Sequence, residues 1–357
     1  GSPDELMWFN KNAKMTDSAI LTADINLNEN MEAAEDALYK WTPMGTTSSN
    51  AYAGSFDGAG YTVSGLYVKN AANGTGFFGY VGAGGEVKNL TVSGKIFADG
   101  NRNYTGGIVG DCKGTVMNCH NLAEIHGYRY VGGVVGDLES GGSMGGCSNR
   151  GSVIASDHSA GGLVGRIDSS SGSAVTNSFN AGAVTGTTKV GGVIGDQYAF
   201  GSVVSNVYNT GSVTATTGYA GGILGNLRSG TLKAAYTIAA VTAGSDSSAG
   251  CVAGSLEWAS GAKAFDQVYY LKTQNQSDVA NWNGCTIQSG SAAGKASDEL
   301  KALAQALGSA FVDDADRINE GYPILSWQAG DGETDPDAPE MDPNGWDGKA
   351  SDAAPSQ

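Results

Sequence analysis

The sequence predicts an all-β fold, namely a right-handed parallel β-helix (β-solenoid) of about 26–31 residues per coil, with short capping helices at both ends. The main observation is a recurring phrase of two glycines, two apolar residues and a third glycine. It occurs at Gly106–Gly110, Gly132–Gly136, Gly161–Gly165, Gly191–Gly195 and Gly221–Gly225, with weaker copies near Gly76 and Gly250. The second positions of successive phrases, counted from Gly76 to Cys251, are 31, 26, 29, 30, 30 and 29 residues apart. A near-fixed period of this size indicates one supersecondary unit stacked many times.

A strand-like run follows each phrase and repeats its residue types in aligned columns. The columns comprise asparagines (Asn121, Asn149, Asn180, Asn209), small residues (Ala123, Gly151, Gly182, Gly211) and apolar residues (Ile125, Val153, Val184, Val213, Val241). A repeated asparagine in a turn can bond to the backbone and to its own copies in neighbouring coils. Parallel crossovers favour right-handed coiling. A propeller is the competing fold, but its blades need about 40 residues and four antiparallel strands.

The two ends of the chain differ from the repeats and define four predicted segments. Residues 1–75 form an N-terminal cap and first coils, beginning with a helix that Ser2 caps. Residues 76–254 hold the repeats, and 255–328 hold C-terminal coils and a capping helix, predicted from Leu300, Leu303, Leu307 and Phe311 at helical spacing. Such caps cover the open sheet edges of a solenoid. Residues 329–357 form an acidic, Pro-rich linker, with eight acidic residues against one lysine.

Composition excludes several classes of partner. The net charge of −16 argues against nucleic acid, because phosphate binding requires a basic surface. No apolar run approaches the roughly 20 residues of a membrane span, so we expect no direct membrane insertion. Five cysteines at irregular spacing are neither a disulfide framework nor a metal knuckle. Cys119 and Cys147 share a column, where they are either small buried side chains or a disulfide.

The repeats resemble the GLUG family of bacterial cell-surface and adhesin-like proteins, named for a Gly-Leu-hydrophobic-Gly core that is nearest to Gly162–Gly165 here. Together with the stretches YAGSFDGAG and GYPILSWQ, the resemblance covers roughly residues 3 to 328. It implies an extracellular setting, secreted or attached to a cell surface, and no chemistry of its own. We therefore expect a monomeric module whose partners are flanking modules of the same polypeptide, with host or matrix glycans or proteins as candidate ligands.

The sequence offers no set of residues for catalysis. The three histidines (His120, His126, His158) form no HExxH motif, and neither a GxSxG elbow nor a P-loop occurs. The glycine phrase is not a phosphate loop, because no helical pattern follows it. We therefore predict no catalytic residues, no cofactor and no metal motif.

Two columns beside the phrase supply the candidate ligand-binding residues. The residue after each phrase is Asp111, Asp137 or Arg166 in three successive repeats, and the adjacent aspartates repel unless they are solvated or bridged by a cation such as Ca²⁺. Three residues before the second glycine stand Tyr104 and Tyr130, which either offer an aromatic platform to a sugar or pack on each other.

These features predict a non-enzymatic module that acts as a rigid stalk or adhesin-like scaffold. The alternative is a β-helix carbohydrate-active enzyme or a glycan-binding module, which would need paired carboxylates in a groove. The column containing Asp111, Asp137 and Arg166 comes closest to that requirement.

Overall fold

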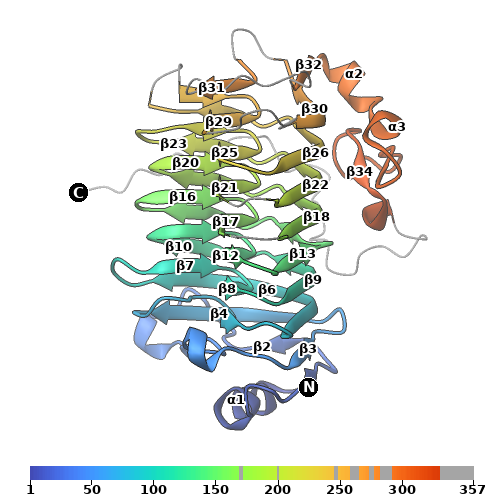
Figure 1. Cartoon of the computed structure of the whole chain (residues 1–357). Coiled ribbons are helices and arrows are strands. Elements are labelled where there is room, and N and C mark those ends of the chain that lie inside the picture. The colour runs from blue at the N-terminus through green and yellow to red at the C-terminus, as the bar shows by residue number, and fades with distance from the viewer. Residues whose placement is uncertain are drawn as a thin grey trace.

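The computed structural model describes residues 1–168, 172–198, 201–244, 248–257, 265–272, 277–281 and 292–329. The chain folds as a right-handed parallel β-helix of about seven turns, which confirms the predicted fold class (Figure 1). Every pairing among its three large sheets is parallel and joins strands of neighbouring coils.

One coil illustrates the repeating unit. Strand β11 (Arg129–Gly132) leads through a tight corner into β12 (Val135–Glu139). The chain then turns into β13 (Ser143–Gly145) and β14 (Ser148–Asn149), and β15 (Val153–Ala155) completes the coil. Each of these strands pairs with its equivalents in the coils below and above, so that equivalent residues form columns along the axis.

Three sheets run along the solenoid. The six-stranded sheet contains β28 (Ala249–Gly250), β24 (Ala220–Gly221), β20 (Thr188–Gly191), β16 (His158–Gly161), β11 and β7 (Asn103–Gly106). The eight-stranded sheet contains β31 (Val279–Asn281), β29 (Ala253–Leu256), β25 (Leu224–Leu227), β21 (Ile194–Gln197), β17 (Val164–Asp168), β12, β8 (Val109–Cys112) and β5 (Phe78–Val81).

The 18-stranded sheet holds two strand positions per coil, because the long strand β6 joins them. With β13, β14 and β15 it contains β1 (Ala19–Ile20), β2 (Ile25–Asn26), β3 (Ser55–Asp57), β4 (Thr62–Asn70), β6 (Glu86–Ala98), β9 (Thr115–Asn121), β10 (Glu124–Gly127), β18 (Ala174–Asn180), β19 (Val184–Gly186), β22 (Val203–Asn209), β23 (Val213–Ala215), β26 (Thr231–Thr237), β27 (Val241–Thr242), β30 (Phe265–Leu271) and β32 (Ala293–Lys295). Short 3₁₀ helices η1 (Glu35–Ala37) and η2 (Ser48–Asn50) interrupt the N-terminal coils.

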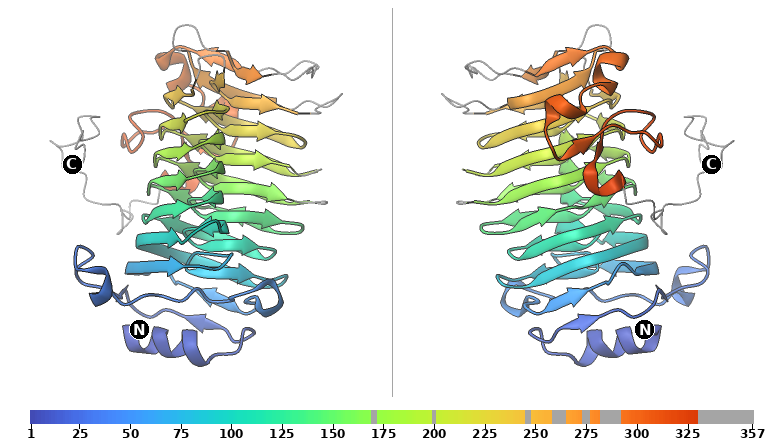
Figure 2. Two further views of the ribbon diagram at one scale, coloured as in Figure 1. Left: turned by 90° about the vertical axis from the view of Figure 1, so that its left-hand side faces the viewer. Right: turned by 90° about the vertical axis from the view of Figure 1, so that its right-hand side faces the viewer.

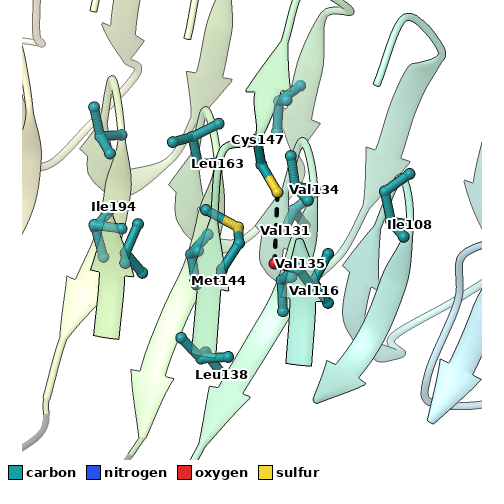
Figure 3. Close-up of a cluster of buried hydrophobic side chains, with 14 of the residues drawn as sticks. Ile108, Val116, Val131, Val134, Val135, Leu138, Met144, Cys147, Leu163 and Ile194 are labelled. Carbon is teal, nitrogen blue, oxygen red and sulfur yellow. Dashed lines mark hydrogen bonds between the residues drawn. The ribbon is translucent and has the colours of Figure 1, made fainter. Parts of the chain in front are cut away.

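The interior of the solenoid is filled with aliphatic side chains from all three sheets. Val131, Val134, Val135, Leu138 and Met144 of one coil are at most 1% exposed and pack on their equivalents in the next (Figure 3). Because each coil buries its apolar face only against its neighbours, the coils stabilise one another as a continuous core.

The predicted asparagine column forms a buried ladder. The Nδ2 of Asn121 donates to the Oδ1 of Asn149 at 2.7 Å, and Asn149 and Asn180 repeat the contact with the next coil at 2.8 Å. Asn209 ends the ladder by donating to the carbonyl of Gly222. Each amide also bonds to the backbone two residues on, so these four coils are tied both to themselves and to a neighbour.

The N-terminal end is covered as predicted. Helix α1 (Pro3–Asn12) lies below the first coils (Figure 1), and the Ser2 hydroxyl accepts a hydrogen bond from the backbone N–H of Glu5. The Glu5 carboxylate pairs with the amino terminus of Gly1 at 2.5 Å. Leu6 is the buried residue of the helix and joins the main core.

The C-terminal segment differs from the expectation in both form and position. The predicted helix is split into α2 (Ser297–Lys301) and α3 (Ala304–Leu307), followed by the antiparallel pair β33 (Phe311–Val312) and β34 (Ile324–Leu325) and by η4 (Ser326–Ala329). This segment, residues 297–329, lies along the flank of the solenoid and not across its end (Figure 2). We call it the strap.

The reason for this position is an apolar column on the outer face of the 18-stranded sheet. Phe179, Tyr208 and Tyr236 stack at centroid distances of 4.8 and 5.1 Å. The strap covers them with buried side chains at the predicted positions: Leu300, Leu303, Leu307 and Phe311. The acidic linker predicted for residues 329–357 lies outside the described residues beyond Ala329.

Candidate functional site

The two columns of candidate ligand-binding residues lie against each other. Tyr104 and Tyr130 come from the six-stranded sheet, and Asp111, Asp137 and Arg166 come from the eight-stranded sheet. The guanidinium carbon of Arg166 lies 4.0 Å from the ring centroid of Tyr130 and 5.8 Å from that of Tyr104. The structure therefore brings all five predicted residues into one site. We call the two facing columns the polar seam, which consists of Tyr104, Tyr130, Ser159, Lys189, Asp111, Asp137, Arg166 and Asp196.

A repeated backbone feature builds the tyrosine side of the seam. Its four residues, Tyr104, Tyr130, Ser159 and Lys189, all have a positive φ, between 53° and 68°. Non-glycine residues rarely adopt this conformation, so its recurrence in four successive coils marks a fixed bend in the strand. Two coils above Tyr130, the same backbone bend brings Lys189 Nζ to 2.9 Å from Asp196 Oδ2.

The centre of the seam is a buried ion pair. Asp137 is fully buried, and Arg166 donates to it through Nε at 3.1 Å and through Nη2 at 2.5 Å. Arg166 also reaches Asp168 at 3.0 Å. Burial raises the pKa of Asp137 to about 6, against the lowering effect of Arg166, so this carboxylate is ionised at neutral pH.

Asp111 has a less favourable environment. It is 5% exposed, and one of its carboxylate oxygens lies within 4.8 Å of oxygens of Asp137 and Glu139. Burial, followed by the negative charges of Glu139 and Asp137, raises the pKa of Asp111 to about 8. Lys113 pairs with Glu139 at 3.1 Å. Among the described residues, Asp111 and Asp137 of the seam and the adjacent Glu139 form a group of carboxylates close enough together to hold a metal ion.

Tyr104 and Tyr130 pack on each other, which is one of the two arrangements that the sequence predicts. Their ring centroids are 5.8 Å apart and the planes are inclined by only 16°. The ring faces in this contact are not open to a sugar, and Arg166 occupies further ring surface of Tyr130. A sugar platform at these two residues remains a prediction, now limited to the ring edges and the remaining face of Tyr104.

The histidines and cysteines singled out in the sequence occupy separate structural positions. His120 hydrogen-bonds to the Ser148 hydroxyl at 2.9 Å, and His126 pairs with Glu124 at 2.5 Å. Cys119 and Cys147 lie in one column as predicted, but both are buried free thiols. Burial raises the pKa of each, as expected for unreactive structural thiols.

A shallow groove on the 18-stranded sheet was not predicted from the sequence. It has a volume of about 370 Å³, and its lining includes Phe97, His126 and Ile154, which are outward-facing neighbours on successive coils. The signal was available, because these residues align in one column. Hydrogen bonds from Lys40 and Lys69 lower the pKa of Glu35 at its rim to about 2, so Glu35 is not suited to act as a general acid.

Among the described residues, no helix has the length and apolar character needed to cross a membrane.

Comparison with known proteins finds a structure with a similar fold and a protein whose sequence is similar over part of this chain. No family model matches the chain. A 189-residue stretch, 52% of the chain, is 30% identical to part of halomucin from Haloquadratum walsbyi, of which it spans only 2%. The crystal structure of a candidate immunoglobulin A1 protease from Bacteroides ovatus superposes with a TM-score of 0.55, at 20% identity, over 91% of each chain. At that identity the likeness establishes a shared fold alone.

Proposed function

We propose that this chain is a non-enzymatic extracellular module of a bacterial surface protein, serving as a rigid stalk or adhesin-like scaffold. The GLUG-like repeats suggest a cell-surface setting. The partial similarity to halomucin and the fold shared with the Bacteroides ovatus protein are compatible with a β-helix module in a larger protein. Host or matrix glycans or proteins are the proposed ligands, and flanking modules of the same polypeptide are its structural partners.

The main support for this proposal is that the repeated polar residues bond to one another between coils. The amides of Asn121, Asn149 and Asn180 each bond to the next coil. In the seam, Arg166 bonds to Asp137 and Asn226 bonds to Asp196, each across two neighbouring coils. Polar columns in this chain thus hold coils together, which suits a stiff spacer. At about 4.8 Å per coil, seven coils give a rod roughly 34 Å long.

Two measurements on the full chain test the proposal. The first is incubation with a panel of acidic and neutral polysaccharides, in which we expect no product release. Release of oligosaccharides would overturn the proposal in favour of the carbohydrate-active alternative. The second is an array of host glycans and matrix proteins. Binding supports the adhesin-like role, whereas an array without binding rejects that role and leaves the stalk.

A further inference from the structure

Lys189 and Asp196 of the polar seam form a cluster with Asn226, in which one carboxylate binds both an amine and an amide. The Nζ of Lys189 donates to Oδ2 of Asp196 at 2.9 Å, and the Nδ2 of Asn226 donates to Oδ1 of the same carboxylate at 2.8 Å. The side chain of Asp196 is 5% exposed and that of Lys189 is 24% exposed, while Asn226 is fully buried. The cluster is therefore largely shielded from water.

The backbone places Lys189 directly beside Asn226 of the next coil. A β-carbon added at the glycine just before Asn226 would lie 2.3 Å from the carbonyl carbon of Lys189. Two coils below, the equivalent residues Tyr130 and Arg166 are in contact, with the guanidinium carbon 4.0 Å from the ring centroid. Lys189 takes the place of Tyr130 and Asn226 takes the place of Arg166, so these two side chains are neighbours in the same way.

The amide of Asn226 is bonded differently from those of the asparagine ladder. Within the described part of the chain, Oδ1 of Asn226 is buried without a hydrogen-bond partner. In the ladder, by contrast, Oδ1 of Asn180 accepts hydrogen bonds from Asn149 and from the backbone N–H of Gly182. A buried carbonyl oxygen without a donor costs stability, so its presence calls for an explanation. The amide carbon of Asn226 lies beside an amine and a carboxylate, which together are the groups that amide exchange requires.

We propose that Lys189 and Asn226 react to form an isopeptide bond, with Asp196 as the catalytic proton carrier. Asp196 accepts a proton from the Lys189 ammonium, and the neutral Nζ attacks Cγ of Asn226. In the tetrahedral intermediate Asp196 passes its proton to Nδ2 and accepts a second proton from Nζ. The Cγ–Nδ2 bond then breaks, so that an amide joins Nζ to Cγ. Ammonia leaves and takes the proton on Asp196 with it as ammonium, which restores the carboxylate without any oxidant or cofactor.

The fold favours this reaction in two ways. It holds the amine, the carboxylate and the amide together, so that the attack is intramolecular. Burial also favours the first proton transfer, because an ion pair held away from water loses the solvation that stabilises its charges. The flexible stem of Lys189 lets Nζ move from Asp196 to Cγ of Asn226.

The bond would join β20 covalently to β25 of the next coil. It would act as a staple between two coils that the asparagine ladder and the sheets already hold by hydrogen bonds. This inference goes beyond the proposed function, and its test is independent of whether the chain binds or cleaves a glycan.

Mass spectrometry of the full chain, intact and after denaturation and digestion with trypsin, tests the proposal. The linked protein is lighter than its sequence by one molecule of ammonia. Trypsin cleaves the unlinked chain after Lys189 and gives the peptides 167–189 and 190–228. It does not cleave after a lysine whose Nζ is part of an amide, so the linked chain gives residues 167–228 as one peptide that is lighter by ammonia. An asparagine that cyclises elsewhere also loses ammonia, but it leaves the cleavage after Lys189 intact.

Three variants each remove one reacting group, and a fourth is the control. Lys189→Arg keeps the positive charge beside Asp196, Asn226→Ser matches the serine that follows in this column, and Asp196→Ala removes the proton carrier. The control is Lys233→Arg, because Lys233 pairs with Asp266 on the surface, where 53% and 45% of the two side chains are exposed.

We expect the linked peptide in the wild type and in Lys233→Arg, and the full mass with cleavage at position 189 in the three site variants. Should Asp196→Ala fail to fold by circular dichroism, Lys189→Arg decides, because an arginine can keep the ion pair. A wild type with the full mass and both separate peptides overturns the proposal. So does a peptide 167–228 that has lost water and not ammonia, which would place the link on Asp196. A link that persists in folded Asp196→Ala overturns the role of Asp196.

Discussion

The side-chain amide of Asn149 occupies the space into which a β-carbon on Gly133 would project. Gly133 is the second glycine of its corner, and Asn149 lies later in the same coil, on the buried ladder. The same relationship holds in three other coils, for the pairs Gly107–Asn121, Gly162–Asn180 and Gly192–Asn209. The corner glycine and the ladder asparagine are therefore one structural unit.

The ends of the solenoid support this coupling. In the coil just before the first full phrase, the corner carries Phe77 and the ladder column carries Val92, which pairs with Asn121. In the last complete corner Cys251 replaces the glycine, and the ladder column carries Tyr270. The intervening coil keeps its corner glycine, Gly222, although its ladder position carries Thr237, whose Cγ2 would lie 2.9 Å from an added β-carbon. The glycine is therefore kept wherever a ladder side chain points at the corner.

Gly133→Ala should destabilise the fold by about 2–3 kcal/mol, because the new methyl group overlaps both the Asn149 amide and the carbonyl of Gly162. The control is Gly186→Ala, which should change stability by less than about 0.5 kcal/mol. Gly186 lies in a column with Ala155 and Ala215, and the nearest atoms to its added methyl group are side-chain carbons at 3.0 Å or more. Chemical denaturation measures both changes.

A double-mutant cycle isolates the contact with the amide. Asn149→Ala removes the amide, so Gly133→Ala should cost about 1 kcal/mol less in that background. Part of the cost remains, since the carbonyl of Gly162 is unchanged. Strictly additive effects of the two substitutions would contradict the coupling.

The sequence was sufficient to predict the repeating coil and several of its columns. The period, the asparagine column at Asn121 to Asn209 and the membership of the aspartate column all follow from equivalent positions in successive coils. Such contacts join residues about 30 positions apart in a fixed register, so alignment of the repeats reveals them.

Contacts between different columns could not be predicted in this way. That Tyr130 meets Arg166 depends on the bend at the positive φ of Tyr130 and on the sharpness of the corner. Likewise, the helical spacing of Leu300 and Leu307 indicated an apolar face but not its partner. The flank was the available surface, because Tyr208 and Tyr236 leave aromatic rings uncovered there without the strap.

Removing the guanidinium of Arg166 should destabilise the fold, because the carboxylate of Asp137 then stays buried without a partner. Arg166→Ala leaves Asp137 fully buried and without its ion pair, so we expect a loss of about 3–5 kcal/mol in the free energy of unfolding. Arg129→Ala is the matched control. Arg129 pairs with Asp157 on the surface, with 43% and 30% of the two side chains exposed, and its loss should cost less than about 1 kcal/mol.

Urea denaturation of the two arginine variants at neutral pH measures the difference. Asp137→Asn combined with Arg166→Ala should recover part of the lost stability, because the uncompensated charge is then gone. Equal, small losses in both single variants would show that water reaches Asp137 and that the pair is not buried in solution.

Alkaline pH should loosen the strap through Tyr236. Its hydroxyl donates to the carbonyl of Pro323 at 2.5 Å and accepts from Asn319, and burial raises its pKa well above the usual 10. Electrostatic interactions with the nearby titratable groups Tyr208, Asp314 and Tyr322 raise this pKa further. A phenol with a raised pKa in the folded state stays protonated while its unfolded counterpart ionises. Stability is therefore fully present below pH 10 and falls as the pH rises above it.

The thermal midpoint measured between pH 9 and pH 12 reports this effect. Wild type should lose stability across that range, and Tyr236→Phe should lose less of it, although the variant starts lower because Asn319 and Pro323 each lose a partner. Tyr61→Phe is the control, since Tyr61 is 36% exposed and should leave the alkaline slope unchanged. An identical slope in wild type and Tyr236→Phe would contradict the prediction.

Trp327 anchors the end of the strap to the solenoid, and its removal should free the strap without unfolding the coils. Its indole Nε1 donates to the carbonyl of Asn177 at 2.9 Å, and its ring stacks on Phe179 at 5.8 Å. Trp327→Ala should weaken docking by about 1–2 kcal/mol, the scale of one hydrogen bond and one aromatic contact. Hydrogen exchange should then accelerate in β33 and β34 while β17 and β21 stay protected. Trp8→Ala, at a tryptophan 65% exposed on α1, should leave exchange in the strap unchanged, and equal exchange in all three proteins would show that Trp327 does not hold the strap in place.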